Sequence, residues 1–248
     1  MKALLLNSGV GRRMGESTAL RPKCMCEIGG DYSILSRQLT LLDSAGIRET
    51  VITVGPFAPQ LKSYVDSLGL HMKITYVPNA LYEKTNYIYS MHLAAEHLND
   101  DILLLHGDLV LEKSVLDDLL SLEKSSVAVD STLPLPQKDF KARIIDGRVM
   151  AIGIEFFGPD CLACQPAYFW KKEDFAAWMQ AIGGFCSRGD VKVYAENAFN
   201  EKQGAIPLYP MELNGRLCHE IDTPEDLKTV SAMFLESLQT EEKGGATL

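Results

Sequence analysis

Basic side chains follow a glycine-containing loop near the start of the chain, and together they could bind a polyphosphate. Gly9 and Gly11 come after a short apolar run, and glycine lets a backbone turn tightly and bring its N–H groups close to a ligand. Fixed positive charge then follows within twelve residues, at Arg12, Arg13, Arg21 and Lys23. Because the 248-residue chain has a formal net charge of −9, this local group of cations predicts an anionic ligand.

The spacing of these residues excludes two other phosphate-binding loops. A P-loop has the pattern G-x-x-x-x-G-K-[ST], and no lysine follows Gly11 or Gly15 in that way. A dinucleotide-binding loop, G-x-G-x-x-G, needs a third glycine where this chain has Met14. Taken alone, two glycines could equally belong to an ordinary turn. Their neighbouring cations favour a loop that serves nucleotidyl transfer.

Asp108 and Asp222 are candidate ligands for Mg²⁺. Asp108 follows a strongly apolar segment, and Asp222 precedes a well-capped helix start. Either one alone could be a turn or capping carboxylate. Together they supply the hard oxygen ligands that Mg²⁺ takes, with substrate phosphates completing its coordination. His106, beside this turn, is expected to be structural.

Composition restricts the function further. The acidic balance, without an extended basic face, argues against nucleic acid as a partner. The chain has neither an apolar run long enough for a membrane span nor a signal-peptide core, so we expect a cytoplasmic protein.

Two cysteine pairs, Cys24-x-Cys26 and Cys161-x-x-Cys164, suggest zinc, but they are far apart in sequence and no further spacing links them. Free thiols are expected.

The elements that must position these residues alternate along the first half of the chain. Strands are expected at 3–6, 50–54, 73–77 and 102–106. Helices are expected at 33–46, at 58–68, from the aromatic and polar stretch 82–90 to His97, and from Ser114, with a capping box to Asp117. This alternation predicts an α/β fold with a doubly wound, mostly parallel, Rossmann-like sheet. In such sheets ligands bind beyond the carboxyl ends of the strands.

The second half has short strands at 127–130, 142–145, 149–154 and 191–194, a hairpin turn at Asp146-Gly147 and a helix at 172–183. Thr223-Pro-Glu-Asp226 is a capping box that begins the last helix. We therefore predict one domain over 1–239. It has a nucleotide-binding half at 1–125, a small α+β acceptor-binding part at 126–221 and a closing helix at 222–239, followed by a flexible tail at 240–248.

The segment from Leu6 to Lys23 resembles the signature of the nucleotidyltransferases that make sugar nucleotides and CDP-alcohols, in which a G-x-G-x-R loop precedes a Pro-Lys pair. The resemblance extends to Leu105-His-Gly-Asp108 and Glu220-Ile-Asp222, and so covers nearly the whole chain. The segments 85–90 and 220–226 are most similar to phosphocholine and phosphonate cytidylyltransferases. The loop differs at Asn7-Ser8, where two alanines are common, and at Met14, where leucine is usual.

This resemblance implies a role for each site residue. Arg13 and Lys23 would be catalytic, and Asp108 and Asp222 would bind Mg²⁺. The expected nucleotide-binding residues are Asn7, Ser8, Gly9, Gly11, Arg12, Asn79 and Asn86. An amide can pair with a pyrimidine edge, although Asn79 or Asn86 could instead serve a turn or a helix cap.

The acceptor is expected near Tyr194, Glu196 and Lys141. Choline-handling relatives hold the quaternary ammonium in an aromatic cage, and Tyr194 could contribute to one. Glu196 could pair with a primary ammonium, and Lys141 could meet a phosphonate. These residues favour an aminoalkyl phosphonate over phosphocholine.

The resulting hypothesis is a cytidylyltransferase that transfers CMP from CTP to a small phosphonate or phosphate monoester, with release of pyrophosphate. CTP is favoured over UTP by the resemblance alone, and a homodimer is left open. Two alternatives remain: a sugar-1-phosphate nucleotidyltransferase of the same fold, and a nucleotide-sensing module that has lost catalysis.

Overall fold

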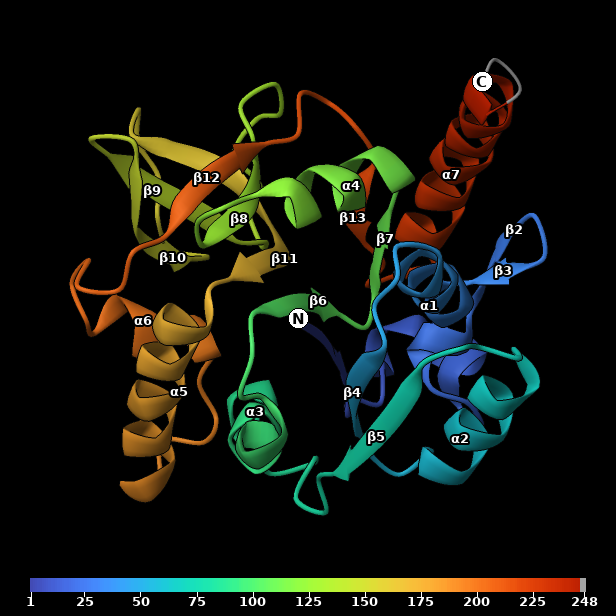
Figure 1. Cartoon of the computed structure of the whole chain (residues 1–248), viewed down its shortest axis with the longest axis horizontal. Helices are drawn as coiled ribbons and strands as arrows, with labels where there is room; N and C mark the ends of the chain where they lie inside the picture. Colours follow the sequence, from blue (N-terminus) through green and yellow to red (C-terminus); the bar gives the residue numbers. More distant parts are fainter. Residues whose placement is uncertain (246–248) are drawn as a thin grey trace.

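The computed structural model describes residues 1–245, without the side chains of Ser17 and of residues 242–245. Within this part of the chain, a nine-stranded mixed sheet forms the centre of the molecule (Figure 1). Four strands run parallel, in the order β6-β1-β4-β5: β1 (Lys2–Asn7), β4 (Glu49–Val54), β5 (Lys73–Pro78) and β6 (Ile102–His106). Leu6 pairs with His106, and Asn7 pairs with Val54. The carboxyl ends of the three central strands therefore meet at one edge.

Helices cover both faces of this sheet, as the doubly wound prediction requires. Neighbouring residues of a strand point to opposite faces, so Leu4 and Leu5 belong to different hydrophobic clusters. The Leu4 cluster includes residues of α3 (Tyr87–Ala94), α5 (Lys172–Ser187) and α6 (Ala195–Asn200). The Leu5 cluster includes residues of α1 (Ile34–Ser44), α2 (Ala58–Ser67) and α4 (Lys113–Ser121). The predicted fold class is confirmed.

The observed helix starts can be compared with the capping residues in the sequence. Ser33 caps α1, and its side chain accepts a hydrogen bond from Ser36 N. Thr223 and Asp226 form the predicted capping box at the start of α7 (Pro224–Gly245). The predicted box at Ser114 is wrong, because α4 begins one residue earlier and has no side-chain cap. The Ser114 hydroxyl instead donates to the carboxylate of Glu112.

The longest strand, β11 (Cys161–Trp170), is absent from the sequence-based prediction. It pairs with β6, with β8 (Ser126–Asp130) and with β9 (Lys141–Ile145), so it joins the two halves of the sheet. Pro166 lies inside it, and proline argues against a central strand because it cannot donate to the ladder. Here the register of the β8 pairing shifts between Gln165 and Tyr168, which accommodates the proline.

Other parts of the second half were predicted with mixed success. Asp146 and Gly147, with φ of 51° and 72°, turn β9 into β10 (Arg148–Gly153), which confirms the hairpin. The predicted strand at 191–194 is wrong, since this segment has no strand pairing and Tyr194 caps α6. The strand β12 (Tyr209–Glu212), which pairs with β8, was missed.

Two smaller sheets complete the described fold. β2 (Glu27–Gly29) pairs with β3 (Tyr32–Ser33), and β7 (Leu109–Leu111) pairs with β13 (Cys218–Glu220). In the second of these, Ile221 N donates to Asp108 O at 2.9 Å. This pairing brings the segment around Asp222 to the end of β6.

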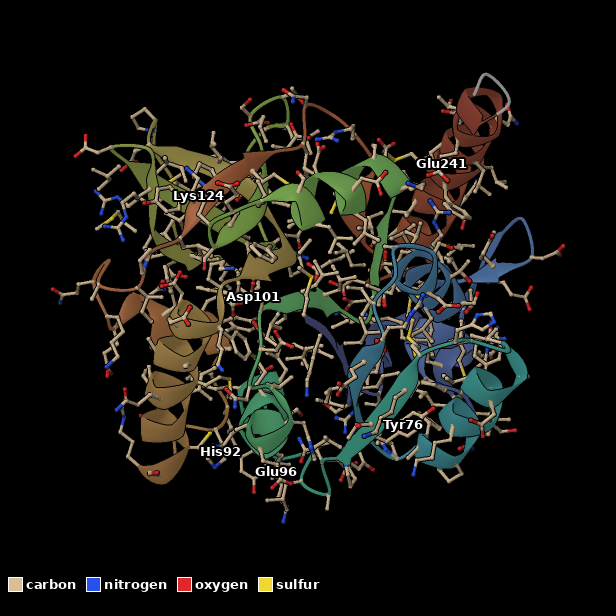
Figure 2. The ribbon with its side chains drawn as sticks, viewed as in Figure 1. Tyr76, His92, Glu96, Asp101, Lys124 and Glu241 are labelled. Atoms are coloured by element: carbon tan, nitrogen blue, oxygen red, sulfur yellow. The ribbon has the colours of Figure 1, made fainter. Side chains whose placement is uncertain are left out.

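The last helix, α7, continues through the first part of the expected tail. Glu241 accepts hydrogen bonds from the Arg37 guanidinium at 2.6 Å and from Lys113 N at 2.8 Å, and Figure 2 shows Glu241 beside the start of α4. Residues 240–245 are thus helical, and 246–248 lie outside the described residues. None of the described helices has the length and apolar character needed to cross a bilayer.

Candidate active site

The loop after β1 folds back onto Lys23, and this geometry requires glycine at position 11. Gly11 has φ of 63°, in the left-handed region, and a Cβ there would lie 2.9 Å from Lys23 Cβ. Its carbonyl accepts hydrogen bonds from Met14 N and from the Thr18 hydroxyl, both at 2.9 Å. In the described part of the chain, the backbone N–H groups of Gly9 and Gly11 donate to no protein acceptor. They are available to a ligand.

Lys23 lies between the two predicted metal-binding carboxylates. Its Nζ is 2.5 Å from Asp108 Oδ2 and 2.9 Å from Asp222 Oδ1, and its side chain is 14% exposed. Arg13 also reaches Asp222 Oδ1, at 2.8 Å. Burial alone would lower the pKa of Lys23, but the two carboxylates raise it. Burial alone would raise the pKa of Asp108, but the Lys23 ammonium lowers it. The ammonium and at least one carboxylate are therefore charged at neutral pH.

Glycines at two neighbouring strand ends allow the loops to approach closely. A Cβ at Gly107 would lie 2.0 Å from Asn7 Oδ1, and one at Gly55 would lie 2.3 Å from Ser8 O. The Ser8 hydroxyl is hydrogen-bonded to that of Ser90 at 2.7 Å. The ends of β1, β4 and β6 are thus packed against one another below the glycine loop.

His106 and Glu220 belong to the same site, although the sequence analysis assigned His106 a structural role and no role to Glu220. His106 Nδ1 lies 3.2 Å from Glu220 Oε1. Burial and the nearby Asp108 raise the pKa of Glu220 to about 7. The sequence did contain a signal that could have placed them in this site, because His106 and Glu220 each precede an expected metal ligand by two residues. In an extended chain such residues project to the same side.

The donor set here fits a divalent cation. Ligand atoms of His106, Asp108 and Glu220 lie within 4.8 Å of one another. Asp108 Oδ1 is buried and has no hydrogen-bond partner among the described residues, and an orphaned carboxylate oxygen is costly unless an ion or water satisfies it. Carboxylates suit Mg²⁺, and an imidazole suits metals such as Mn²⁺ as well.

These residues line a cavity of about 450 Å³ that also has an aromatic wall. The ring of Tyr194 lies 6.0 Å from that of Tyr87 and 5.1 Å from that of Phe140, measured between centroids. Tyr87 in turn packs edge-on against His106, at 4.7 Å. The cavity thus has basic side chains at the glycine loop and aromatic rings around Tyr194.

Most of the predicted site residues line this cavity, namely Asn7, Gly9, Gly11, Arg12, Arg13, Lys23, Asn86, Asp108, Tyr194 and Asp222. The other four predicted residues, Ser8, Asn79, Lys141 and Glu196, do not line it. Asn79 is 3% exposed and bonds to Thr85, Ser90 and Leu81 N. Ser8 is also buried, and its backbone rather than its hydroxyl borders the loop.

Glu196 and Lys141 do not reach the cavity either. Glu196 is 1% exposed and accepts hydrogen bonds from the hydroxyls of Tyr87 and Tyr168. Lys141 is fully buried, and its ammonium donates to the carbonyls of Pro136 and Ile154. Both side chains instead bond to neighbouring segments of the protein, Glu196 to Tyr87 of the cavity wall and Lys141 to the carbonyl of Ile154.

The cysteine pairs form no metal site in the described structure. All six cysteines are free, and the single group of metal-binding side chains found among the described residues contains none of them.

Comparison with known proteins identifies the family. Residues 3–188 match the model of the MobA-like NTP transferase domain. A CMP-5'-(3-aminopropyl)phosphonate synthase of Streptomyces rubellomurinus is 36% identical over 135 residues, which is 54% of this chain but 21% of that protein. The choline-phosphate cytidylyltransferase of Streptococcus pneumoniae is 25% identical over 243 residues, 94% of this chain and 98% of the relative.

Solved structures share the fold over almost the full length. The CTP:phosphocholine cytidylyltransferase from Streptococcus pneumoniae superposes with a TM-score of 0.76 at 21% identity, over 94% of this chain and 98% of that chain. The inositol-1-phosphate CTP transferase from T. maritima gives a TM-score of 0.76 at 20% identity, over 95% of both chains. Because the family model covers well over half of the chain, the protein belongs to the MobA-like NTP transferase domain family and is a nucleotidyltransferase.

Proposed function

We propose that this protein is a cytidylyltransferase that transfers CMP from CTP to a small phosphonate or phosphate monoester with an amino group. The observation that carries the proposal is the position of Lys23, held between Asp108 and Asp222 at the mouth of the glycine loop. Relatives whose names specify CTP and a phosphorus-containing acceptor support the choice of nucleotide and acceptor class.

In this proposal the glycine loop holds the triphosphate. The free N–H groups of Gly9 and Gly11 face the phosphates, and Arg12 and Arg13 supply charge from exposed positions at the cavity. Asn86 is the better candidate for the base, because its Oδ1 caps α3 at Tyr87 N while its amide N–H groups remain free among the described residues. Asn79 would act indirectly, by ordering the loop before α3.

The reaction would be an in-line attack of an acceptor oxygen on the α-phosphorus of CTP. A bond forms between that oxygen and the phosphorus, the bond to the bridging oxygen of the β-phosphate breaks, and pyrophosphate leaves. The attacking phosphonate or phosphate oxygen is already ionised at neutral pH, so the site needs no strong general base. Lys23 and Arg13 would stabilise the charge that develops on the transferred group.

We propose Asp108 and Asp222 as ligands of a divalent cation. The free Oδ1 of Asp108 supports this proposal, and His106 and Glu220, whose ligand atoms lie within 4.8 Å of one another and of Asp108, are further candidates. When bound, the cation would polarise phosphate oxygens and neutralise their charge. In the structure the Lys23 ammonium is paired with both carboxylates. With these carboxylates holding a cation, the ammonium would be free to turn toward the phosphates.

The acceptor side of the cavity suits a cation. The Glu196 carboxylate is buried behind Tyr87, and its bonded donors are two neutral hydroxyls. Among the described residues Glu196 forms no ion pair, and its carboxylate lies next to the Tyr87 ring, against which His106 packs edge-on. An aromatic face backed by a carboxylate attracts an ammonium group. This arrangement favours an aminoalkyl phosphonate or phosphate over a neutral sugar phosphate.

Pyrophosphate release is the test. Each of the four NTPs should be combined with Mg²⁺ and with 2-aminoethylphosphonate, phosphocholine or glucose-1-phosphate. We expect turnover with CTP and an amino acceptor. Turnover confined to glucose-1-phosphate would establish the sugar-1-phosphate alternative, and nucleotide binding without any turnover would establish the sensing module. The division into a nucleotide-binding half at 1–125 and an acceptor-binding part at 126–221 stays a prediction.

A further inference from the structure

A second cavity, of about 340 Å³, adjoins the first, and three residues line both of them: Asn86, Ile154 and Tyr194. Its size is within the range of small-molecule sites. Tyr194, one of these shared residues, belongs to the aromatic part of the first cavity, where its ring lies 6.0 Å from that of Tyr87 and 5.1 Å from that of Phe140. A ligand that enters from the active site would therefore reach the second cavity through the acceptor end.

The second cavity carries two side chains of opposite charge. Glu155 follows Ile154 directly, and Lys192 lies two residues before Tyr194. Neither has a hydrogen bond or an ion pair with any other described residue, although the Glu155 carboxylate interacts electrostatically with the buried Lys141 ammonium. The amide of Asn197 also lines this cavity. These groups are free to bind a ligand.

The wall that carries Glu155 is held in place by the fold. A Cβ at Gly153 would lie 2.6 Å from Glu155 Oε2, so the glycine lets this carboxylate lie against the backbone at the cavity. The carbonyl of Ile154, the residue before Glu155, accepts a hydrogen bond from the buried Lys141 ammonium at 2.5 Å. The same ammonium lies 4.1 Å from the centroid of the Phe157 ring. Glu155 is thus attached to a fixed segment, although its side chain is exposed.

We propose that the second cavity binds the carboxylate of an acceptor that ends in an α-amino acid group. The inference rests on the proposed cytidylyl transfer. The ammonium lies at the junction of the cavities, against Tyr194 and beside Glu155, and the carboxylate extends past Tyr194 to Lys192 and the Asn197 amide. Two side chains of opposite charge that line one cavity suit a zwitterion better than a simple amine.

Two matched pairs of acceptors test this assignment. 2-Aminoethylphosphonate and phosphonoalanine differ only by the α-carboxylate, and phosphoethanolamine and O-phosphoserine differ in the same way with one more atom before the amine. We expect kcat/KM to be higher for the carboxylated member of at least one pair. Lys192→Gln should lower it for that member by about tenfold, the effect of one charge-assisted hydrogen bond, while the uncarboxylated member is unchanged.

Two further variants separate the contributions. Lys202→Gln removes the same charge from an exposed lysine that lines neither cavity, and it should affect no acceptor. Glu155→Gln should weaken all four amino acceptors while preserving the preference for the carboxylate. Equal loss on both members of each pair in Lys192→Gln, or no preference for the carboxylate in the wild-type protein, would overturn the proposal.

Calorimetry keeps this test separate from that of the proposed function. If CTP gives no pyrophosphate with any of the four acceptors, cytidylyl transfer is wrong. Titration of phosphonoalanine and 2-aminoethylphosphonate into the wild-type protein and Lys192→Gln still decides the carboxylate site. Tighter binding of phosphonoalanine that Lys192→Gln abolishes supports it, and equal binding of the two compounds refutes it.

Discussion

Replacing Lys23 by methionine should lower kcat strongly while it increases the affinity for a divalent cation. Methionine keeps the unbranched stem that packs against Gly11 but removes the ammonium between Asp108 and Asp222. Loss of one fixed donor at developing charge costs on the order of 10²–10³ in kcat. The same ammonium opposes a dication at the two carboxylates, so Mg²⁺ should bind on the order of tenfold more tightly without it.

Steady-state pyrophosphate release gives kcat and the KM for CTP, and calorimetric titration with Mg²⁺ gives the metal affinity without turnover. Lys202→Met is the matched control, since it makes the same substitution at an exposed lysine that lines neither cavity. Surface substitutions away from a site usually have small effects, so the control should keep kcat within about threefold. A Lys23→Met protein that raises KM with kcat intact, or binds Mg²⁺ more weakly, would refute the assigned role.

Three further predictions follow from the geometry. Gly11→Ala should lower kcat at least about tenfold more than Gly69→Ala, because both glycines have φ of +63° but only Gly11 would contact Lys23; equal effects would contradict the assigned contact. Glu196→Gln should raise the KM for a cationic acceptor by about threefold to tenfold with the KM for CTP unchanged, because it removes the charge behind Tyr87; equal increases in both would show a general structural defect. Without divalent cations, thermal stability should fall as the pH rises from about 5 to 7. The pKa of Glu220 is raised from 4.5 to about 7 in the folded protein, so in this range the folded state binds a proton that the unfolded state has lost. Glu220→Gln should flatten this part of the stability profile, and an unchanged slope would assign the pH dependence to other groups.

Local patterns predicted the nucleotide-binding half well. The strand ends that carry Asn7 and Asp108 were expected at one edge of a parallel sheet, and β1 and β6 are indeed neighbours there. This success has a physical reason, since buried parallel strands are continuous apolar runs and their connecting helices have a clear period. In the second half, β11 was missed because Pro166 interrupts its pattern, and residues 191–194 were wrongly predicted as a strand.

Side-chain direction was much less predictable than position along the chain. Glu196 and Lys141 were expected at the acceptor, yet both are buried and bonded to other parts of the protein. Whether a polar side chain faces a cavity or the core depends on partners that are distant in sequence, such as Tyr168 for Glu196. Sequence spacing contains no information about such partners.

The sequence by itself identified the loop as a candidate phosphate-binding loop, because glycine conformational freedom and fixed positive charge are properties of residue types. It also determined the two aspartates as candidate metal ligands. Only the tertiary structure decided that Lys23 lies between Asp108 and Asp222, and that His106 meets Glu220. The pairing of β7 with β13 joins segments about a hundred residues apart, and long-range strand pairing of this kind is set by the packing of the whole domain rather than by either segment.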